Sequence, residues 1–262
     1  MTPDTLIRPA LARHPVAAGD EWLVQRKVLL QREKELMRLH DEVARERRAL
    51  PWQRLEKNYV FVADEGVRTL ADLFDGRRQL LVQHFMLGPD WEQGCPSCSY
   101  MADHTDGMNV HLAQRDISFV AVSRAPLADI ARFRARMGWQ FRWVSSAGSD
   151  FNFDFHVSFS AKERASGAVY YNYHAVDFPA EEAPGLSVFY KDDDGEVFHT
   201  YSTFGRGVEV MMGAYALMDL TPQGRGERDV PHKMEWVRHH DRYPPSAAVR
   251  AAASASCCAS HA

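Results

Sequence analysis

The sequence lacks an excess of positive charge and any long apolar run. Lys and Arg number 31 against 35 Asp and Glu, so the formal net charge is −4. Nucleic-acid-binding domains carry a basic surface, which makes nucleic acid an unexpected partner here. No stretch approaches the roughly 18 consecutive apolar residues of a membrane-spanning helix. We therefore expect a protein that acts on neither nucleic acid nor membrane.

Cysteine is also scarce: the four cysteines form two close pairs, Cys95 with Cys98 and Cys257 with Cys258. So few and so clustered, they do not form the framework of a disulfide-stapled domain. The first residues lack the basic start and apolar run of a secretory signal, so we expect a cytoplasmic protein. In that compartment a Cys-x-x-Cys pair is typically redox-active or metal-binding.

What the chain does have is length and apolar residues, 262 residues of which 45% are hydrophobic. That is enough for a sizeable core and argues against a disordered chain. We expect an amphipathic helical extension over 1–50, one α/β domain over 51–222, a polar extension over 223–245 and a disordered Ala/Ser tail over 246–262.

Residues 20–49 predict one long helix, which Pro51 ends because proline lacks a backbone donor and restricts its predecessor. Its charged end is more typical of a solvated face than of a binding patch. The helix is a candidate for homodimer formation. Its apolar residues at mostly helical spacing are Leu23, Leu29, Leu30, Leu36, Met37, Leu39 and Val43.

The body of the domain alternates predicted strands with predicted helices, which indicates βαβ units and a mixed sheet flanked by helices. In the first strand, alternation places Leu80, Val82, His84 and Met86 on one face. A helix over 126–138 closes at Gly138, and a last helix is expected near 207–222. The strands are expected over 79–86, 116–123 and 141–146, with a hairpin over 186–203.

The Cys-x-x-Cys pair falls at a strand-to-helix turn, with Pro96 at the first helical position and Cys98 one turn further. A helix N-terminus carries partial positive charge and unpaired N–H groups, which stabilise a thiolate. The spacing therefore predicts Cys95 as a nucleophile and Cys98 as its resolving thiol.

These residues resemble the thioredoxin fold superfamily. Trp91 lies four residues before Cys95, and Ala183-Pro184 precedes a strand and hairpin, as in that superfamily. The resemblance implies that Pro184 is cis and packs against the disulfide. It also implies that Pro184 and Trp91 belong to the site, and that the backbone of Ala183 faces a peptide or thiol partner.

More closely, ALPW, HFMLGPDW, CPSC, VSRAP, SDFNFDF, EEAPGLSVF and DLTPQGR resemble a bacterial thioredoxin-like family of unknown function, from about residue 20 to 243. The resemblance implies a thioredoxin-like fold and a dithiol site. Pro96-Ser97 replaces thioredoxin's Gly-Pro, so a potential anywhere from about −270 to −120 mV is open. Glu92 stands where peroxiredoxins have Thr before their reactive cysteine, which weighs against a peroxidase.

The leading hypothesis is a thiol-disulfide oxidoreductase that needs no cofactor and acts on a protein or small-molecule thiol or disulfide. An alternative is a metal-binding protein or copper-dependent oxidase. It would hold Cu(I) or zinc on Cys95 and Cys98 together with His84 or His199. A third is an interaction module with a vestigial dithiol.

Other histidines and arginines have plainer interpretations. The alternative interpretation of His84 and His199 is that both are ordinary histidines of the hydrophobic core. His232, His239 and His240 are expected on a solvated face, and Arg124 is either solvated or close to the site at the carboxyl edge of the sheet.

Overall fold

The computed structural model describes residues 14–228 and 230–244. Contacts divide the chain between Pro51 and Trp52 into two units, which are described separately below. The predicted tail over 246–262, with Cys257 and Cys258, lies outside the described residues. The boundary placed after residue 222 stays a prediction.

The described part of the first unit contains the helix α2 (Gly19–Ala49), which confirms the long helix predicted from the sequence. Asp20 and Glu21 lie in its first turn and Arg47 and Arg48 in its last, which complements the helix dipole. The helix ends where Leu50 leaves helical geometry before Pro51. None of its residues is buried.

The second unit contains an eight-stranded mixed sheet in the order β1-β10-β9-β4-β5-β6-β2-β3. Neighbours β4, β5 and β6 run parallel, whereas β9 is antiparallel to both β4 and β10. The strands are β1 (Gln53–Arg54), β2 (Val60–Ala63), β3 (Gly66–Thr69), β4 (Gln79–His84), β5 (Ile117–Ser123), β6 (Arg142–Ser145), β9 (Gly185–Lys191) and β10 (Val197–Phe204).

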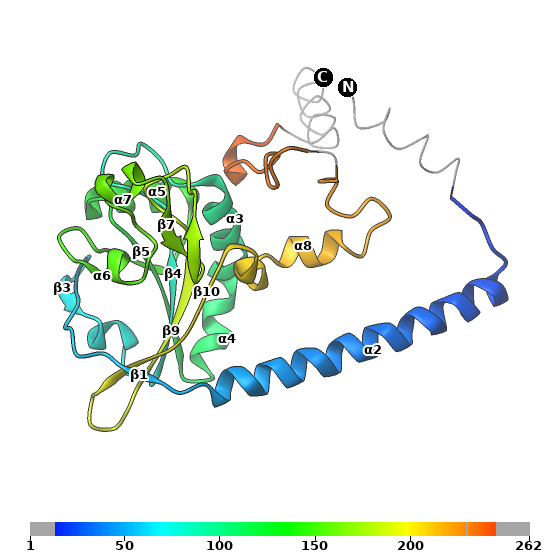
Figure 1. Ribbon diagram of the computed structural model, residues 1–262, viewed down its shortest axis with the longest axis horizontal. Helices are drawn as coiled ribbons and strands as arrows, with labels where there is room; N and C mark the ends of the chain where they lie inside the picture. Colours follow the sequence, from blue (N-terminus) through cyan, green and yellow to red (C-terminus); the bar gives the residue numbers. More distant parts are fainter. Residues whose placement is uncertain (1–13, 229, 245–262) are drawn as a thin grey trace, which may run out of the picture. The chain divides into compact units, whose positions relative to one another are not determined.

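The order of elements along the chain is that of the thioredoxin-like fold: β4, α3, β5, α5 and then the antiparallel hairpin β9–β10. In the sheet these strands lie in the order β10-β9-β4-β5, which is also that of this fold. The predicted fold class is thereby confirmed. In Figure 1, α3 and α4 lie along one side of the sheet. Helix α5 connects the parallel strands β5 and β6. The helix that follows β4 is the one that carries the cysteines.

Helices connect these strands, and in the described ranges none is both long and apolar enough to cross a membrane. The predicted helix over 126–138 is present as α5 and ends at Gly138 in the left-handed conformation, φ 70°. The α-helices are α3 (Pro96–Thr105), α4 (Asn109–Ala113), α5 (Leu127–Met137), α6 (Phe151–Asp154), α7 (Ala161–Ala165) and α8 (Gly213–Met218), with 3-10 turns η1 (Ala71–Phe74), η2 (Asp106–Met108), η3 (Gly205–Met211) and η4 (His240–Arg242).

One local expectation was wrong. The single last helix is split into η3 and α8, because Met212 leaves helical geometry just before Gly213. A small hairpin, β7 (Val169–Tyr171) and β8 (His174–Val176), was not expected. Asn172 and Tyr173 both adopt positive φ in its two-residue turn, as such a hairpin turn requires.

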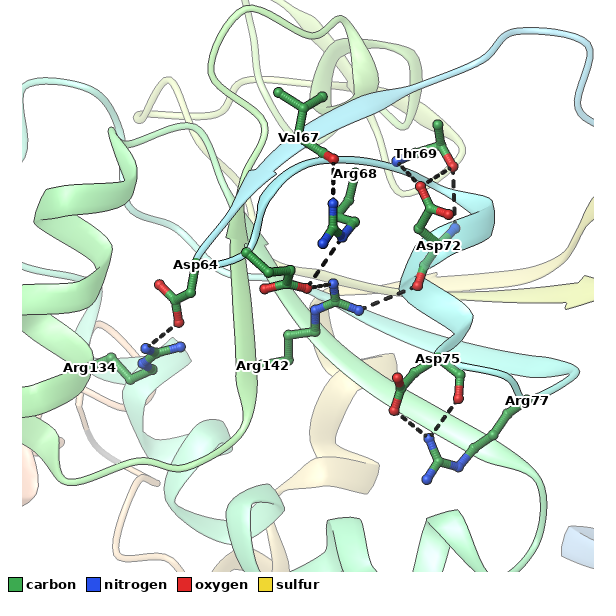
Figure 2. Close-up of polar contacts among 10 residues, drawn as sticks. Asp64, Val67, Arg68, Thr69, Asp72, Asp75, Arg77, Arg134 and Arg142 are labelled. Atoms are coloured by element: carbon green, nitrogen blue, oxygen red, sulfur yellow. Dashed lines mark hydrogen bonds and ion pairs between the residues drawn. The ribbon is translucent and has the colours of Figure 1, made fainter.

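The hairpin β2–β3 is attached to the parallel part of the sheet by ion pairs (Figure 2). Asp64 accepts a hydrogen bond from Arg134 of α5 at 2.8 Å, and Glu65 in the turn pairs with Arg142 of β6. At the start of η1, Asp72 accepts from both the backbone N–H and the hydroxyl of Thr69, each at 2.8 Å. The first two contacts join the β2–β3 turn to α5 and β6.

Side chains of the sheet enter two hydrophobic cores, one on each face. The dithiol-side core contains Phe85, Cys98, Met101, Phe133 and Trp143, and the histidine-side core contains Leu80, Val82, Phe151, Phe155 and Phe189. The alternation predicted along β4 holds as far as His84. Met86 instead packs against the dithiol-side core, because β4 ends at His84.

Candidate functional site

Cys95 occupies the N-cap of α3, and Pro96 fills the first helical position. The Cys95 carbonyl accepts a hydrogen bond from the backbone N–H of Ser99 at 2.9 Å, and this bond begins the helix. Gly94 has no room for a side chain, because a Cβ there would lie 2.5 Å from Phe85 and 2.8 Å from Phe133. Close packing of the loop backbone thus sets where the helix begins.

One residue of the loop, Met86, binds both cysteines. Its carbonyl accepts the N–H of Cys95 at 3.0 Å, and its own N–H points at the sulfur of Cys98 at 3.5 Å. Gln83, fully buried on β4, donates its side-chain amide to the carbonyl of Cys98 at 3.2 Å. The end of β4 therefore holds the two thiols in a fixed relation.

The two thiols are both free, and they differ in exposure and ionisation. Cys95 is partly exposed, whereas Cys98 is completely buried. A hydrogen bond from the Cys98 thiol, helped by backbone N–H groups of the first turn, lowers the pKa of Cys95 to about 7. Burial, together with the adjoining Cys95, raises the pKa of Cys98 well above its usual value. Near neutral pH a substantial fraction of Cys95 is therefore ionised, whereas Cys98 stays protonated.

Trp91 connects the cysteine loop to the segment before β9. Its indole N–H donates to the carboxylate of Glu181 at 3.1 Å, and its ring packs against the dithiol-side core. Gly88 lies against both groups, since a Cβ there would be 2.8 Å from Glu181 and 2.9 Å from the Trp91 nitrogen. Trp91 thus places the 181–184 segment beside the loop that carries Cys95.

The expectation of a cis Pro184 was wrong, because no described peptide bond is cis. The N–H of Ala183 is occupied by the carbonyl of Val157 at 2.8 Å, and Ala183 is buried, so its N–H is not available to a partner. The Pro184 carbonyl accepts the hydroxyl of Tyr171 at 2.7 Å. Burial raises the pKa of Tyr171 to about 12, and the Cys98 thiol nearby adds to the rise. The hairpin β7–β8, through Tyr171, thus holds the segment around Pro184 without a cis bond.

The histidines of the metal hypothesis do not join the cysteines. His84 projects into the histidine-side core, where it stacks on Phe151, whereas Cys98 belongs to the other core. Its Nε2 lies 2.7 Å from the hydroxyl of Ser187, and 2.7 Å contacts continue through Ser202 to Nε2 of His199. Burial lowers the pKa of His84 to about 3 and also lowers that of His199. Both are therefore neutral, with His84 fully buried and His199 half-buried.

The remaining donors do not make a zinc centre. Among residues 14–228 and 230–244, no three side chains of metal-binding type come together. Two thiols alone supply fewer ligands than the tetrahedral sites of zinc require. The set of Cys95, Cys98, His84 and His199 is therefore not assembled, because the sheet separates its sulfur atoms from its imidazoles.

Arg124 and Glu182 lie near the end of β5, at the carboxyl edge of the sheet. Arg124, whose position was left open, pairs with the buried carboxylate of Glu182 at 2.8 Å and is not a freely solvated side chain. Glu182 also accepts the hydroxyl of Ser158 at 2.6 Å. Burial raises the pKa of Glu182 to about 7, an effect that Arg124 and Ser158 oppose.

His239 was expected on a solvated face, and this was wrong. It is 3% exposed, and its Nε2 lies 2.8 Å from the carbonyl of Gly94, next to Cys95. His232 and His240 are exposed as expected. The apolar neighbours Trp236 and Val237 are the sequence signal that this polar segment packs on the domain.

A family model described as "Bacterial protein of unknown function (DUF899)" matches residues 11–243. No curated protein matches the chain. Among solved structures, the peroxidoxin BcpB of Mycobacterium tuberculosis is 14% identical with a TM-score of 0.42, over 62% of this chain and 96% of that one. A cysteine-to-serine mutant of peroxiredoxin Q from Xanthomonas campestris is 12% identical with a TM-score of 0.41, over 60% and 90%.

A candidate thiol:disulfide interchange protein DsbE of Chlorobium tepidum is 15% identical with a TM-score of 0.36, over 63% of this chain and 97% of that one. At this level of likeness no function follows from any of these structures. What the site does has to be argued from its own atoms.

Proposed function

The chain belongs to the DUF899 family of bacterial proteins of unknown function, and from the geometry of its own cysteines we propose that it is a thiol-disulfide oxidoreductase. One observation carries the proposal. Cys95 is a partly exposed thiol at a helix N-cap whose pKa is lowered to about 7, and it accepts a hydrogen bond from the fully buried Cys98. A nucleophile and a resolving thiol need these properties.

In the proposed reaction, the Cys95 thiolate attacks one sulfur of a substrate disulfide. The substrate S–S bond breaks, a Cys95–substrate disulfide forms, and the other substrate sulfur leaves as a thiolate that takes a proton from solvent. Cys98 then loses its proton to solvent and attacks the sulfur of Cys95. This step releases the second substrate thiol, so the substrate gains two electrons and Cys95 and Cys98 become a disulfide.

The buried position of Cys98 supports this division of roles. A completely buried thiol with a raised pKa does not compete for substrate, but it lies next to Cys95 when the mixed disulfide has formed. The N–H of Met86 points at its sulfur, which stabilises the thiolate at the moment of attack. The reverse reaction, oxidation of a substrate dithiol, uses the same steps in the opposite order.

A redox titration of the full chain tests the proposal, with thiols identified by differential alkylation and mass spectrometry. Cys95 and Cys98 should oxidise together to an intramolecular disulfide at a potential between about −270 and −120 mV. Cys98→Ser should trap a mixed disulfide on Cys95 with glutathione disulfide, and Cys95→Ser should trap none on Cys98. The proposal is wrong if the two thiols never form a disulfide with each other in this range.

A further inference from the structure

The described end of the polar extension, residues 234–244, is fastened around the cysteine loop and its two flanking helices. Asp241 takes two hydrogen bonds from Arg136 of α5, at 2.8 and 2.9 Å. His240 lies 2.7 Å from Asp103 of α3. Between these anchors His239 is buried, with its ring edge-on to Phe133 of α5 at 5.3 Å.

His239 and Met86 hold the two ends of one peptide group. The Gly94 carbonyl lies 2.8 Å from Nε2 of His239, and the Cys95 N–H of the same peptide donates to the Met86 carbonyl at 3.0 Å. A peptide group is planar and rigid. Fixing its oxygen and its nitrogen therefore fixes the direction in which the Cys95 side chain leaves the backbone.

The surroundings also select the tautomer of His239 that makes this contact. Arg136 approaches Nδ1 with a guanidinium nitrogen at 3.5 Å, and a guanidinium only donates. Nδ1 is therefore the acceptor, and the proton is on Nε2, where it is donated to the Gly94 carbonyl. Burial lowers the pKa of His239, which keeps the ring in this neutral form.

We propose that His239 is a positioning residue for the Cys95 nucleophile, and that residues 234–244 hold it on the cysteine loop. The inference rests on the proposed function for its biological meaning. His239 does not touch the sulfur. It acts through the Gly94–Cys95 peptide, which directs the thiolate toward the N–H groups of the first turn of α3.

Variants of His239 in the full chain test this role through the pH profile of Cys95 alkylation by iodoacetamide, located by mass spectrometry. His239→Phe keeps the packing on Phe133 but has no donor, so alkylation at pH 7 should slow by about threefold to tenfold with a higher midpoint. His239→Gln, which keeps an N–H donor, should stay close to the wild type. His232→Phe, at an exposed histidine outside residues 234–244, is the matched control.

The proposal is overturned if His239→Phe keeps the wild-type alkylation profile while circular dichroism shows it folded. Should His239→Phe not fold, His239→Asn, whose amide is too short to reach Gly94, replaces it with the same expected shift. Alkylation needs no substrate disulfide, so this result is independent of whether Cys98→Ser traps a mixed disulfide. Failure of the proposed function and failure of the positioning role are thus separate outcomes.

A second inference concerns α2 and rests on different observations. Apolar residues recur along it every seven residues, a spacing that keeps them on one side of a helix. Trp22, Leu29 and Leu36 of this stripe are 59%, 53% and 67% exposed. The stripe consists of Trp22, Leu29, Leu36 and Val43 with the adjoining Leu23, Leu30, Met37 and Ala44.

The charges at its ends indicate which partner fits. The first turn is acidic, with Asp20 and Glu21, whereas the last turns contain Arg45 and Arg48. A second copy running antiparallel places acidic residues against basic ones at both ends, whereas a parallel copy opposes like charges. We infer that α2 pairs antiparallel with α2 of a second copy of this chain.

Analytical ultracentrifugation of the full chain tests this pairing. The wild type should dimerise, and Leu29→Glu with Leu36→Glu should raise the dimer dissociation constant by at least about a hundredfold. Val24→Glu with Val28→Glu, at exposed apolar positions outside the stripe, should not. Asp20→Arg with Glu21→Arg should weaken the dimer, and adding Arg45→Glu with Arg48→Glu should restore it. A monomeric wild type, or equal effects of both glutamate pairs, overturns the inference.

Discussion

Gln83 and His84 are consecutive residues of β4, both buried, and their side chains enter cores of opposite character. The amide of Gln83 binds the carbonyl of Cys98 and leaves its own oxygen without a partner among the described residues. His84 begins a chain of short contacts through Ser187 and Ser202 that ends at His199. On one face of the sheet a buried amide thus holds the backbone of the cysteine helix. On the other face the polar groups contact one another, except for Nδ1 of His84, which has no partner among the described residues.

The difference shows what makes a buried titratable group functional. On the dithiol side, a helix N-terminus and a partner thiol favour the charged form of Cys95, which solvent can reach. On the histidine side, burial favours the neutral form of His84, and no approach to solvent exists for its ring, which is 1% exposed. Burial alone is therefore a poor guide to chemistry.

The largest expected effect comes from a substitution on the histidine side, which should change the stability of the protein but not the ionisation of Cys95. Phe151→Ala removes a fully buried ring that stacks on His84, so it should lower the free energy of unfolding by about 3–5 kcal/mol. Because Phe151 lies across the sheet from the cysteines, the pH midpoint of Cys95 alkylation should stay unchanged. Urea unfolding and alkylation measure the two quantities, and a moved midpoint would show that the faces are coupled.

Removal of the partner thiol should affect ionisation instead. Cys98→Ala deletes the hydrogen bond that lowers the pKa of Cys95. A hydrogen bond to a charged group contributes about 1.5–3 kcal/mol, so the pKa of Cys95 should rise by about 1–2 units. Cys98→Ser keeps an O–H donor and should leave the pKa low. Equal pKa values of Cys95 in the two variants, measured by thiolate absorbance, would contradict this cause.

A third prediction concerns the loop that leads into α3. Gly94→Ala would place its Cβ within 3 Å of Phe85 and Phe133, so it should destabilise the protein by about 1–3 kcal/mol. Gly107→Ala, with no atom within 4 Å of its Cβ, is the matched control and should change stability by less than about 0.5 kcal/mol. Similar urea midpoints for both variants would show that the loop moves aside.

Whether the sequence could predict a feature of the fold or the site depends on how far apart in the chain the interacting residues lie. Proline after Cys95 and apolar alternation along β4 are local signals, and they predicted the N-cap position and the face of His84 correctly. The contact between His239 and Gly94 joins residues 145 apart, and no local pattern marks its partner. Such pairings follow only from the assembled fold.

The cis Pro184 illustrates a different limit. It came from a resemblance, and the resemblance described the fold correctly but not this peptide bond. The hydrogen bonds of Ala183 to Val157 and of Tyr171 to Pro184 come from the segment between β6 and β9, which includes the hairpin β7–β8. Loops vary more than the strands they connect, so their partners do not follow from the order of the strands.

The last prediction separates the two faces by pH. His84 is neutral in the folded state, where its pKa is lowered to about 3, but titrates near 6.5 when unfolded. The unfolded state therefore binds more protons between these values. Stability from this group is complete above pH 6.5 and is lost as pH falls, by at most about 1.4 kcal/mol per pH unit.

His84→Gln removes that titration while keeping a polar partner for Ser187, so its free energy of unfolding should fall less steeply from pH 6.5 to 4 than that of the wild type. His232→Gln, at an exposed histidine, should follow the wild type. Urea unfolding at several pH values measures the slopes. Parallel slopes for His84→Gln and the wild type would mean that His84 takes up a proton in the folded state, and the histidine-side core would then be open to chemistry after all.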